Sequence, residues 1–226
     1  MVLLLFDIDG TLILSGGAGF RAMTRAFSEL FGHDDAFRGV QLAGRTDISI
    51  LTDAFEKFGI SNCNGAVESF KDRYFALLPE EIAKPEGDKR IMPGVQQLLD
   101  HLCQLDNVLL ALLTGNWEPS GRIKLAHFGL DRYFPFGAFA DDSARRDELL
   151  PFAVQRFEAR TGQRLQPHEV IVIGDTPSDI LCAKPHGAVS LAVAAAHYTA
   201  EQLQAYEPDH LFDSLQDLPR FLALLH

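Results

Sequence analysis

A chain of 226 residues with 47% hydrophobic and 23% charged side chains has the composition of an ordinary globular protein, which argues against disorder. Its acidic residues outnumber the basic ones by 31 to 20, and the net charge of −11 disfavours a nucleic acid or an anionic membrane surface as partner. A small anionic ligand in a local positive pocket remains compatible with this charge.

The first predicted element is a short buried strand, Val2 to Phe6, because its residues form a continuous apolar run. Two carboxylates, Asp7 and Asp9, follow it, and then Gly10 and Thr11. An ionised acid is costly to bury without a partner, so the pair belongs where the strand stops and a site begins. Taken alone, the hexapeptide also fits a solvated turn.

A helical insertion is predicted for residues 16–88. It begins with a glycine-rich joint at residues 16–19, and apolar side chains then recur at helical spacing in residues 20–31, 48–58 and 67–77. Pro79 breaks this pattern, and the charged stretch 80–90 predicts a second joint.

Helices and apolar runs alternate after Pro93. Helices are expected at residues 95–105, 118–128, 148–160 and 179–186, strands at residues 108–113, 134–139, 170–173 and 189–193, and an apolar tail at residues 215–225. This alternation predicts a Rossmann-like α/β core, residues 1–15 and 89–226, with a mostly parallel sheet covered by helices on both faces. In such sheets, ligands bind beyond the carboxyl ends of the strands.

Three of these strands end in polar clusters. The first precedes Asp7 and Asp9, the second precedes Thr114-Gly115-Asn116, and the third precedes the segment from Asp175 to Asp179. Each cluster has a structural alternative, since Gly and Asn form turns and Asp179 can cap a helix. Parallel strands would bring all three clusters to one edge, and this convergence favours a site.

With these motifs, the chain resembles the haloacid dehalogenase-like hydrolases, in particular phosphoglycolate phosphatase-like members with a helical cap. The resemblance implies that Asp7 is the nucleophile and that Asp9 is the general acid and base. It also implies that Thr114 binds the phosphoryl group, together with Gly115 and Asn116 of the same motif.

The resemblance further implies a Mg²⁺ ion held by Asp7, Asp175 and the main-chain carbonyl of Asp9, with Asp179 supporting the site. The charges agree with this, because two unit charges about 4 Å apart repel by about 4 kcal/mol at an effective dielectric of about 20. A hard cation with oxygen ligands would relieve the repulsion. We expect like-charge proximity to raise the pKa of Asp9 and so supply its proton, and we expect the Thr11 hydroxyl to position Asp9.

A cation is also expected to contact the phosphate. The resemblance places it at Arg146, with its neighbour Arg145 as the alternative; a solvated arginine pair near a helix start is the structural explanation. In the insertion, Arg45 lies between two predicted helices and is suggested to contact an anionic group of the substrate, although an exposed arginine fits equally well. The eight histidines are scattered without metal-ligand spacing, which predicts no histidine site.

We therefore expect a Mg²⁺-dependent phosphatase that hydrolyses a small phosphomonoester, such as phosphoglycolate or a sugar phosphate, through an aspartyl phosphate. A sugar-phosphate mutase and a catalytically silent phospho-ligand binding protein are the alternatives. The expected partner is a small phosphorylated metabolite rather than nucleic acid or membrane, and the Phe-rich insertion permits a homodimer without requiring one.

Cysteine content and the N-terminal run indicate the compartment. Cys63, Cys103 and Cys182 are far apart and odd in number, which predicts reduced core thiols rather than a disulfide framework. The first apolar run ends at Asp7 without a preceding basic segment, so it is too short for a signal peptide or a membrane span. We therefore expect a cytoplasmic protein.

Overall fold

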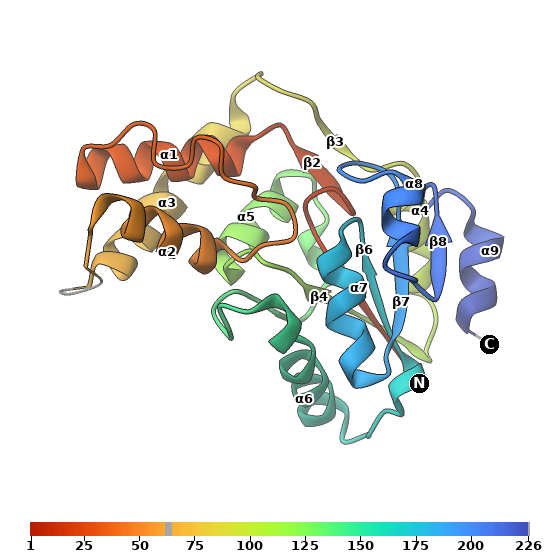
Figure 1. Ribbon diagram of the computed structural model, residues 1–226. Helices are drawn as coiled ribbons and strands as arrows, with labels where there is room; N and C mark the ends of the chain where they lie inside the picture. Colours follow the sequence, from red (N-terminus) through yellow and green to blue (C-terminus); the bar gives the residue numbers. More distant parts are fainter. Residues whose placement is uncertain (62–64, 226) are drawn as a thin grey trace.

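A six-stranded parallel sheet forms the centre of the computed structural model, which describes residues 1–61 and 65–225 (Figure 1). Its strand order is β5-β4-β1-β6-β7-β8. In chain order these strands are β1 (Val2–Phe6), β4 (Val108–Leu113), β5 (Gly137–Ala138), β6 (Val170–Gly174), β7 (Val189–Val193) and β8 (His210–Phe212). The predicted α/β fold with a parallel sheet is confirmed.

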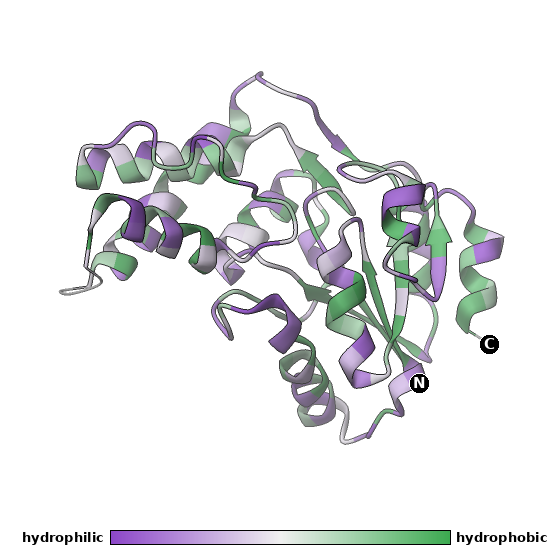
Figure 2. Ribbon diagram, viewed as in Figure 1, coloured by the Kyte–Doolittle hydropathy of each residue, from purple (hydrophilic) through white to green (hydrophobic). Residues whose placement is uncertain are grey.

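Helices cover both faces of this sheet because its central strands are apolar on both sides. Leu4 and Phe6 of β1 pack in one cluster with α4 (Val95–Leu102), α5 (Glu118–His127) and α9 (Leu218–Leu222). Leu3 and Leu5 point to the other face, against α6 (Leu150–Thr161) and α7 (Pro177–Ala183). Figure 2 shows the hydrophobic strands enclosed by helices of mixed character. A short helix, α8 (Ala200–Gln204), lies between β7 and β8.

Most predicted elements are present, with shifted ends. The strand predicted at 134–139 is reduced to Gly137–Ala138, because residues 131–133 form a 3₁₀ turn before it. A second 3₁₀ turn at 146–148 delays α6 to Leu150, and Pro185, which lacks an N–H donor, follows the end of α7 at Ala183. Of the three cysteines, Cys182 is buried and Cys103 is exposed, so the prediction of a core thiol is wrong for Cys103; Cys63 lies outside the described residues.

Three helices, α1 (Ala18–Phe31), α2 (Asp47–Phe58) and α3 (Ala66–Ala83), form a layer beside the carboxyl edge of the sheet (Figure 1). We call this layer the insertion. The prediction that Pro79 ends the last helix is wrong, since α3 continues to Ala83. Contacts with α1 support this end of α3: Arg21 donates from Nε to the Glu81 carboxylate at 3.1 Å and from Nη2 to the Glu81 carbonyl at 2.9 Å.

The two connections between the insertion and the sheet run side by side. Two short strands that the sequence pattern does not predict, β2 (Ile13–Ser15) and β3 (Lys89–Ile91), form an antiparallel pair in which Ser15 lies opposite Lys89. Strands of three residues carry too little periodicity to be recognised. Within the described part of the chain, no helix has the length and apolar character needed to cross a membrane.

Phe27 of α1 is the centre of the apolar cluster in the insertion. Its ring lies 4.8–6.2 Å from the rings of five other phenylalanines, at positions 31, 37, 55, 58 and 70. We expect Phe27→Ala to lower the free energy of unfolding by about 3–5 kcal/mol, since it leaves a cavity among these rings. Urea unfolding measures the loss. Leu30→Ala, on the exposed side of the same helix, is the control, and an equal loss in both variants would contradict the central position of Phe27.

Candidate active site

The three predicted clusters meet at the carboxyl edge of three neighbouring strands. Phe6 at the end of β1 pairs with Leu112 of β4 on one side and with Ile173 of β6 on the other. The N–H of Asp7 continues this ladder and donates to the Ile173 carbonyl at 2.9 Å. The residues that follow each strand therefore face a common space, as the sequence predicts.

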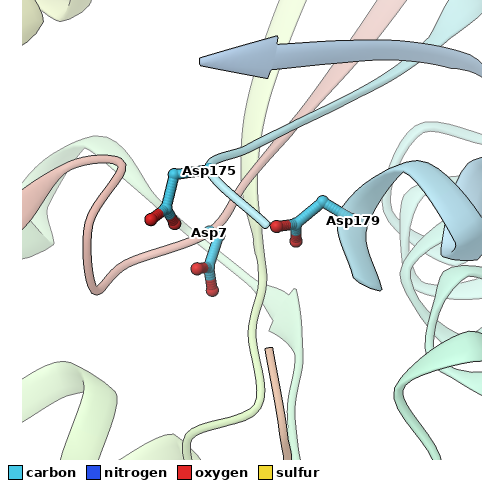
Figure 3. A group of neighbouring side chains, drawn as sticks. All are labelled: Asp7, Asp175 and Asp179. Carbon is cyan, nitrogen blue, oxygen red and sulfur yellow. The ribbon is translucent and has the colours of Figure 1, made fainter. Parts of the chain in front are cut away.

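Three carboxylates from two of these strand ends form a buried acidic cluster, shown in Figure 3. Oxygen atoms of Asp7, Asp175 and Asp179 all lie within 4.8 Å of one another. Gly10 has a φ of 90°, and a side chain there would overlap the Asp175 carboxylate, so this glycine lets the first loop close over the cluster.

Burial and mutual repulsion perturb these acids. Burial, together with the charges of Asp179 and Asp9, raises the pKa of Asp7 to about 6 despite the attraction of Arg146. Burial also raises the pKa of Asp175, although a hydrogen bond to His197 opposes the change. A compact set of carboxylate oxygens, with raised pKa values at Asp7 and Asp175, fits a hard divalent cation, which prefers oxygen ligands and would favour the ionised forms.

Arg146 supplies positive charge directly to the cluster. Its Nη2 lies 3.0 Å from Asp7 Oδ1, and it also pairs with Asp179 and donates to the Leu113 carbonyl at 3.2 Å. Its Nε is buried and has no hydrogen-bond partner within residues 1–61 and 65–225. The alternative residue, Arg145, is 67% exposed and pairs with Asp147. The structure thus places Arg146, and not Arg145, beside Asp7.

The cluster after β4 is tied together by Asn116. Its Nδ2 donates to Thr114 Oγ1 at 2.9 Å and to Asp9 Oδ2 at 3.0 Å, and its backbone N–H also reaches Thr114 Oγ1. Thr114 Oγ1 accepts in these bonds, so neither of them uses its own hydrogen.

The pKa and the hydroxyl partner of Asp9 both differ from the expectation. Burial by itself would raise its pKa, but the charge of Lys124 and hydrogen bonds from Lys124, Asn116 and Ser15 outweigh burial and lower it. The predicted rise is therefore wrong, because a cation on α5 compensates the acid. The expected contact of Thr11 is also wrong: its hydroxyl donates to Asp175 Oδ1 at 3.3 Å, while Ser15 Oγ donates to Asp9 Oδ1 at 3.1 Å.

Two further residues at the site, Lys124 and His197, are not predicted from the sequence. Lys124 is buried and its Nζ lies 2.6 Å from Asp9 Oδ2; its position beside Leu125, on the inward side of a predicted helix, is the signal that could have revealed it. His197 Nδ1 lies 2.8 Å from Asp175 Oδ2. Nothing in the histidine spacing indicates this contact, because it depends on the path of the loop after β7.

A cavity of about 330 Å³ lies between the insertion and the sheet edge. Six of the predicted residues line it, namely Asp7, Asp9, Arg45, Gly115, Asn116 and Arg146. Thr11, Thr114, Asp175 and Asp179 are buried and do not line it. Apolar side chains of the insertion, including Phe20, Met23 and Ile50, line it as well. Arg45 pairs with Asp53 at 2.5 Å, so a substrate anion would compete with Asp53 for it.

The start of α2 joins the insertion to the core. The backbone N–H of Asp47 donates to the Gly115 carbonyl at 2.6 Å. The Asp47 carboxylate accepts, on Oδ2, hydrogen bonds of 3.0 Å from the Trp117 N–H and the Ser120 hydroxyl. Thr46 caps α2 and donates to the Ala144 carbonyl at 2.6 Å. These bonds hold the loop before α2 directly on the loop that follows β4, residues 114–117.

Comparison with known proteins agrees with this geometry. The family model of the haloacid dehalogenase-like hydrolases matches residues 4–184. The chain belongs to this family. A phosphoglycolate phosphatase from Vibrio vulnificus (strain CMCP6) is 31% identical to this family member over 229 residues, covering 96% of the chain and 93% of the relative. A protein from Dickeya dadantii (strain 3937) named "Probable phosphatase IndB" is 26% identical over 221 residues, covering 96% and 91%.

The fold of this hydrolase is shared with solved structures. A haloacid dehalogenase-like family hydrolase from Streptococcus pneumoniae superposes with a TM-score of 0.69 at 22% identity, covering 98% of both chains. The family and the named relatives identify the chain as a phosphatase of the haloacid dehalogenase-like family, and the resemblance predicted from its motifs is confirmed.

The buried carboxyl group of Asp47 is expected to make the free energy of unfolding depend on pH. Burial raises its pKa to about 6, against the charge of Lys124 and two hydrogen bonds. The folded protein therefore binds the proton more tightly than the unfolded chain, and Asp47 reduces stability as pH rises from about 4 to about 6. Asn can accept the same two hydrogen bonds through its single carbonyl oxygen. We expect Asp47→Asn to be up to about 3 kcal/mol more stable relative to wild type at pH 7 than at pH 4.

Denaturant unfolding at both pH values, in chelator, measures this difference. Asp106→Asn at an exposed position is the control and is expected to show no such change between the two pH values. An Asp47→Asn protein whose stability relative to wild type is the same at pH 4 and pH 7 would contradict the assignment.

Proposed function

We propose that this hydrolase is a Mg²⁺-dependent phosphatase that cleaves small phosphomonoesters through an aspartyl phosphate on Asp7. The observation that carries the proposal is that two carboxylates in one cavity have different partners. Asp7 lies against Arg146 and the acidic cluster, whereas Asp9, two residues later, lies against Lys124 and Asn116. We assign attack on phosphorus to the first acid and proton transfer to the second.

In the first half of the proposed reaction, an Asp7 oxygen attacks phosphorus and the ester oxygen leaves. Arg146 and the Thr114 hydroxyl would bind the phosphoryl oxygens, and Asp9 would donate a proton to the leaving oxygen. A negatively charged phosphoryl group beside Asp9 raises the pKa of its carboxyl and so favours the protonated form. In the second half, Asp9 would take a proton from the water that hydrolyses the aspartyl phosphate.

Asp7, Asp175 and the Asp9 main-chain carbonyl would hold the Mg²⁺ ion, and Asp179 would support it. Bound there, the ion would neutralise the acidic cluster and polarise a phosphoryl oxygen.

We further propose that residues 16–88 act as a cap over a small phosphorylated metabolite. The cavity between the insertion and the sheet supports this, as do the two connections that run side by side at Ser15 and Lys89. Relatives named phosphoglycolate phosphatase make phosphoglycolate the first compound to test. A panel of phosphorylated metabolites, including glucose 1-phosphate, would identify the substrate and would reveal a mutase by isomerisation without phosphate release.

Replacing the nucleophile tests the chemistry. We expect Asp7→Asn to lower kcat for phosphate release by at least about 10³-fold, because the amide cannot form the aspartyl phosphate. Circular dichroism is expected to be unchanged, since Asn has nearly the same shape. Asp213→Asn, at an exposed position, is the matched control. Turnover of Asp7→Asn within a few-fold of wild type would refute covalent catalysis by this residue.

Removing the metal tests the acidic cluster. We expect a chelator to abolish hydrolysis of p-nitrophenyl phosphate and added Mg²⁺ to restore it, because a dianionic ester otherwise meets three carboxylates whose charge Arg146 compensates only in part. Initial rates with chelator, and then with Mg²⁺ in excess, measure the effect. Rates that are equal with and without chelator would exclude a metal role, and no turnover of any panel compound would favour a silent binding protein.

A further inference from the structure

Lys124 lies at the junction of the core and the insertion. It is 5% exposed, and its Nζ lies 2.6 Å from both Asp9 Oδ2 and Asn116 Oδ1. It lines the cavity together with these two partners. A buried lysine paired with a carboxylate gains little stability, because the loss of hydration offsets the attraction. A contribution to stability therefore does not account for a lysine at this position.

Lys124 completes a set of donors that holds the Asp9 carboxylate from two sides. Ser15 donates to Oδ1, and Asn116 and Lys124 donate to Oδ2. Arg146 makes the corresponding ion pair with Asp7. Each of the two reacting carboxylates thus has its own cation, from α5 for Asp9 and from the 3₁₀ turn before α6 for Asp7.

The insertion determines where the Lys124 amine lies. A Cβ added at Gly19 of α1 would lie 3.2 Å from Lys124 Nζ, 3.3 Å from its Cε and 3.5 Å from the Tyr74 hydroxyl of α3. Glycine within a helix is about 1 kcal/mol less favourable than alanine. The absence of a side chain at Gly19 leaves room for the end of Lys124. The backbone of α1 at Gly19 therefore lies directly against the end of Lys124, and the Tyr74 hydroxyl of α3 lies close to the same Gly19 position.

We propose that Lys124 is a positioning residue that fixes the Asp9 carboxylate for proton transfer to the leaving oxygen, and that Gly19 of the insertion leaves the space in which the lysine amine reaches Asp9. The inference rests on the proposed phosphatase function, since it concerns the acid of that reaction. It assigns the lysine to the proton transfers of Asp9, tested here at the departure of the leaving group, and not to the binding of the phosphoryl group.

Leaving groups of different basicity separate this role from a structural one. An alkoxide needs a proton as it departs, and a well-placed acid contributes about 10²–10⁴-fold to such a step. Nitrophenolate, which is much less basic, departs with little need of a proton from an acid. Loss of the positioning residue should therefore slow alkyl phosphates and spare p-nitrophenyl phosphate, whereas a general loss of structure would slow both.

The experiment compares kcat/KM of Lys124→Met with that of the wild type, on p-nitrophenyl phosphate and on the alkyl phosphate of the metabolite panel that the wild type hydrolyses fastest. The ratio kcat/KM reports the steps up to departure of the leaving group, and not the later hydrolysis of the aspartyl phosphate, in which Asp9 also acts. We expect a fall of about 10–100-fold on the alkyl ester and of less than about threefold on the aryl ester. Gly19→Ala, which keeps the lysine and displaces it, is expected to shift the ratio in the same direction by a smaller factor. Lys184→Met, at an exposed position at the end of α7, is the control and is expected to change neither rate.

Equal falls on both esters, or no fall on either, would overturn the positioning role. A crystal structure of Lys124→Met supplies a readout that does not depend on turnover. In it, the Asp9 carboxylate is expected to move out of hydrogen-bond distance of the Asn116 side-chain amide. If it remains there, the inference is wrong. If the proposed phosphatase function is wrong, the wild type itself will release phosphate from neither ester. The crystal structure would then still show whether Lys124 positions Asp9.

Discussion

Three buried carboxylates that face one another within 4.8 Å determine how the rest of the site is built. Their repulsion, about 4 kcal/mol for a pair about 4 Å apart at an effective dielectric of about 20, must be compensated locally. Arg146, which precedes Asp179 by more than thirty residues in the chain, forms ion pairs with both Asp7 and Asp179. A chain with a net charge of −11 therefore concentrates buried cations at one edge of its sheet.

The sheet explains why the positions of these acids could be predicted. Asp7 and Asp175 each follow a continuous apolar run, and such runs form the central strands of a parallel sheet because both faces are buried. Once β1 and β6 are neighbours, their carboxyl ends must meet. The same argument places Thr114 after β4. Periodicity and strand topology thus predict where the site lies without any knowledge of side-chain contacts.

Side-chain partners could not be predicted in this way. Thr11 and Ser15 are both hydroxyls shortly after the first strand, and only the turn into β2 decides that Ser15 bonds to Asp9 while Thr11 bonds to Asp175. Lys124 inverts the expected pKa shift of Asp9 from more than a hundred residues away along the chain. Pro79 lies inside α3 because Arg21 of α1 supports the end of the helix. Each of these outcomes depends on tertiary contacts that no local pattern encodes.

The two reacting carboxylates differ in which part of the molecule holds them. The partners of Asp7 all belong to the sheet and its adjoining turns: the Ile173 carbonyl and Arg146. Asp9 instead depends on elements next to the insertion. Ser15 is the last residue of β2, opposite Lys89 where the chain returns from the insertion, and the end of Lys124 lies against Gly19 of α1. A movement of the insertion would therefore disturb Asp9 while leaving Asp7 in place. In the proposed phosphatase, this separation would couple proton transfer, but not the placement of the nucleophile, to closure over the substrate.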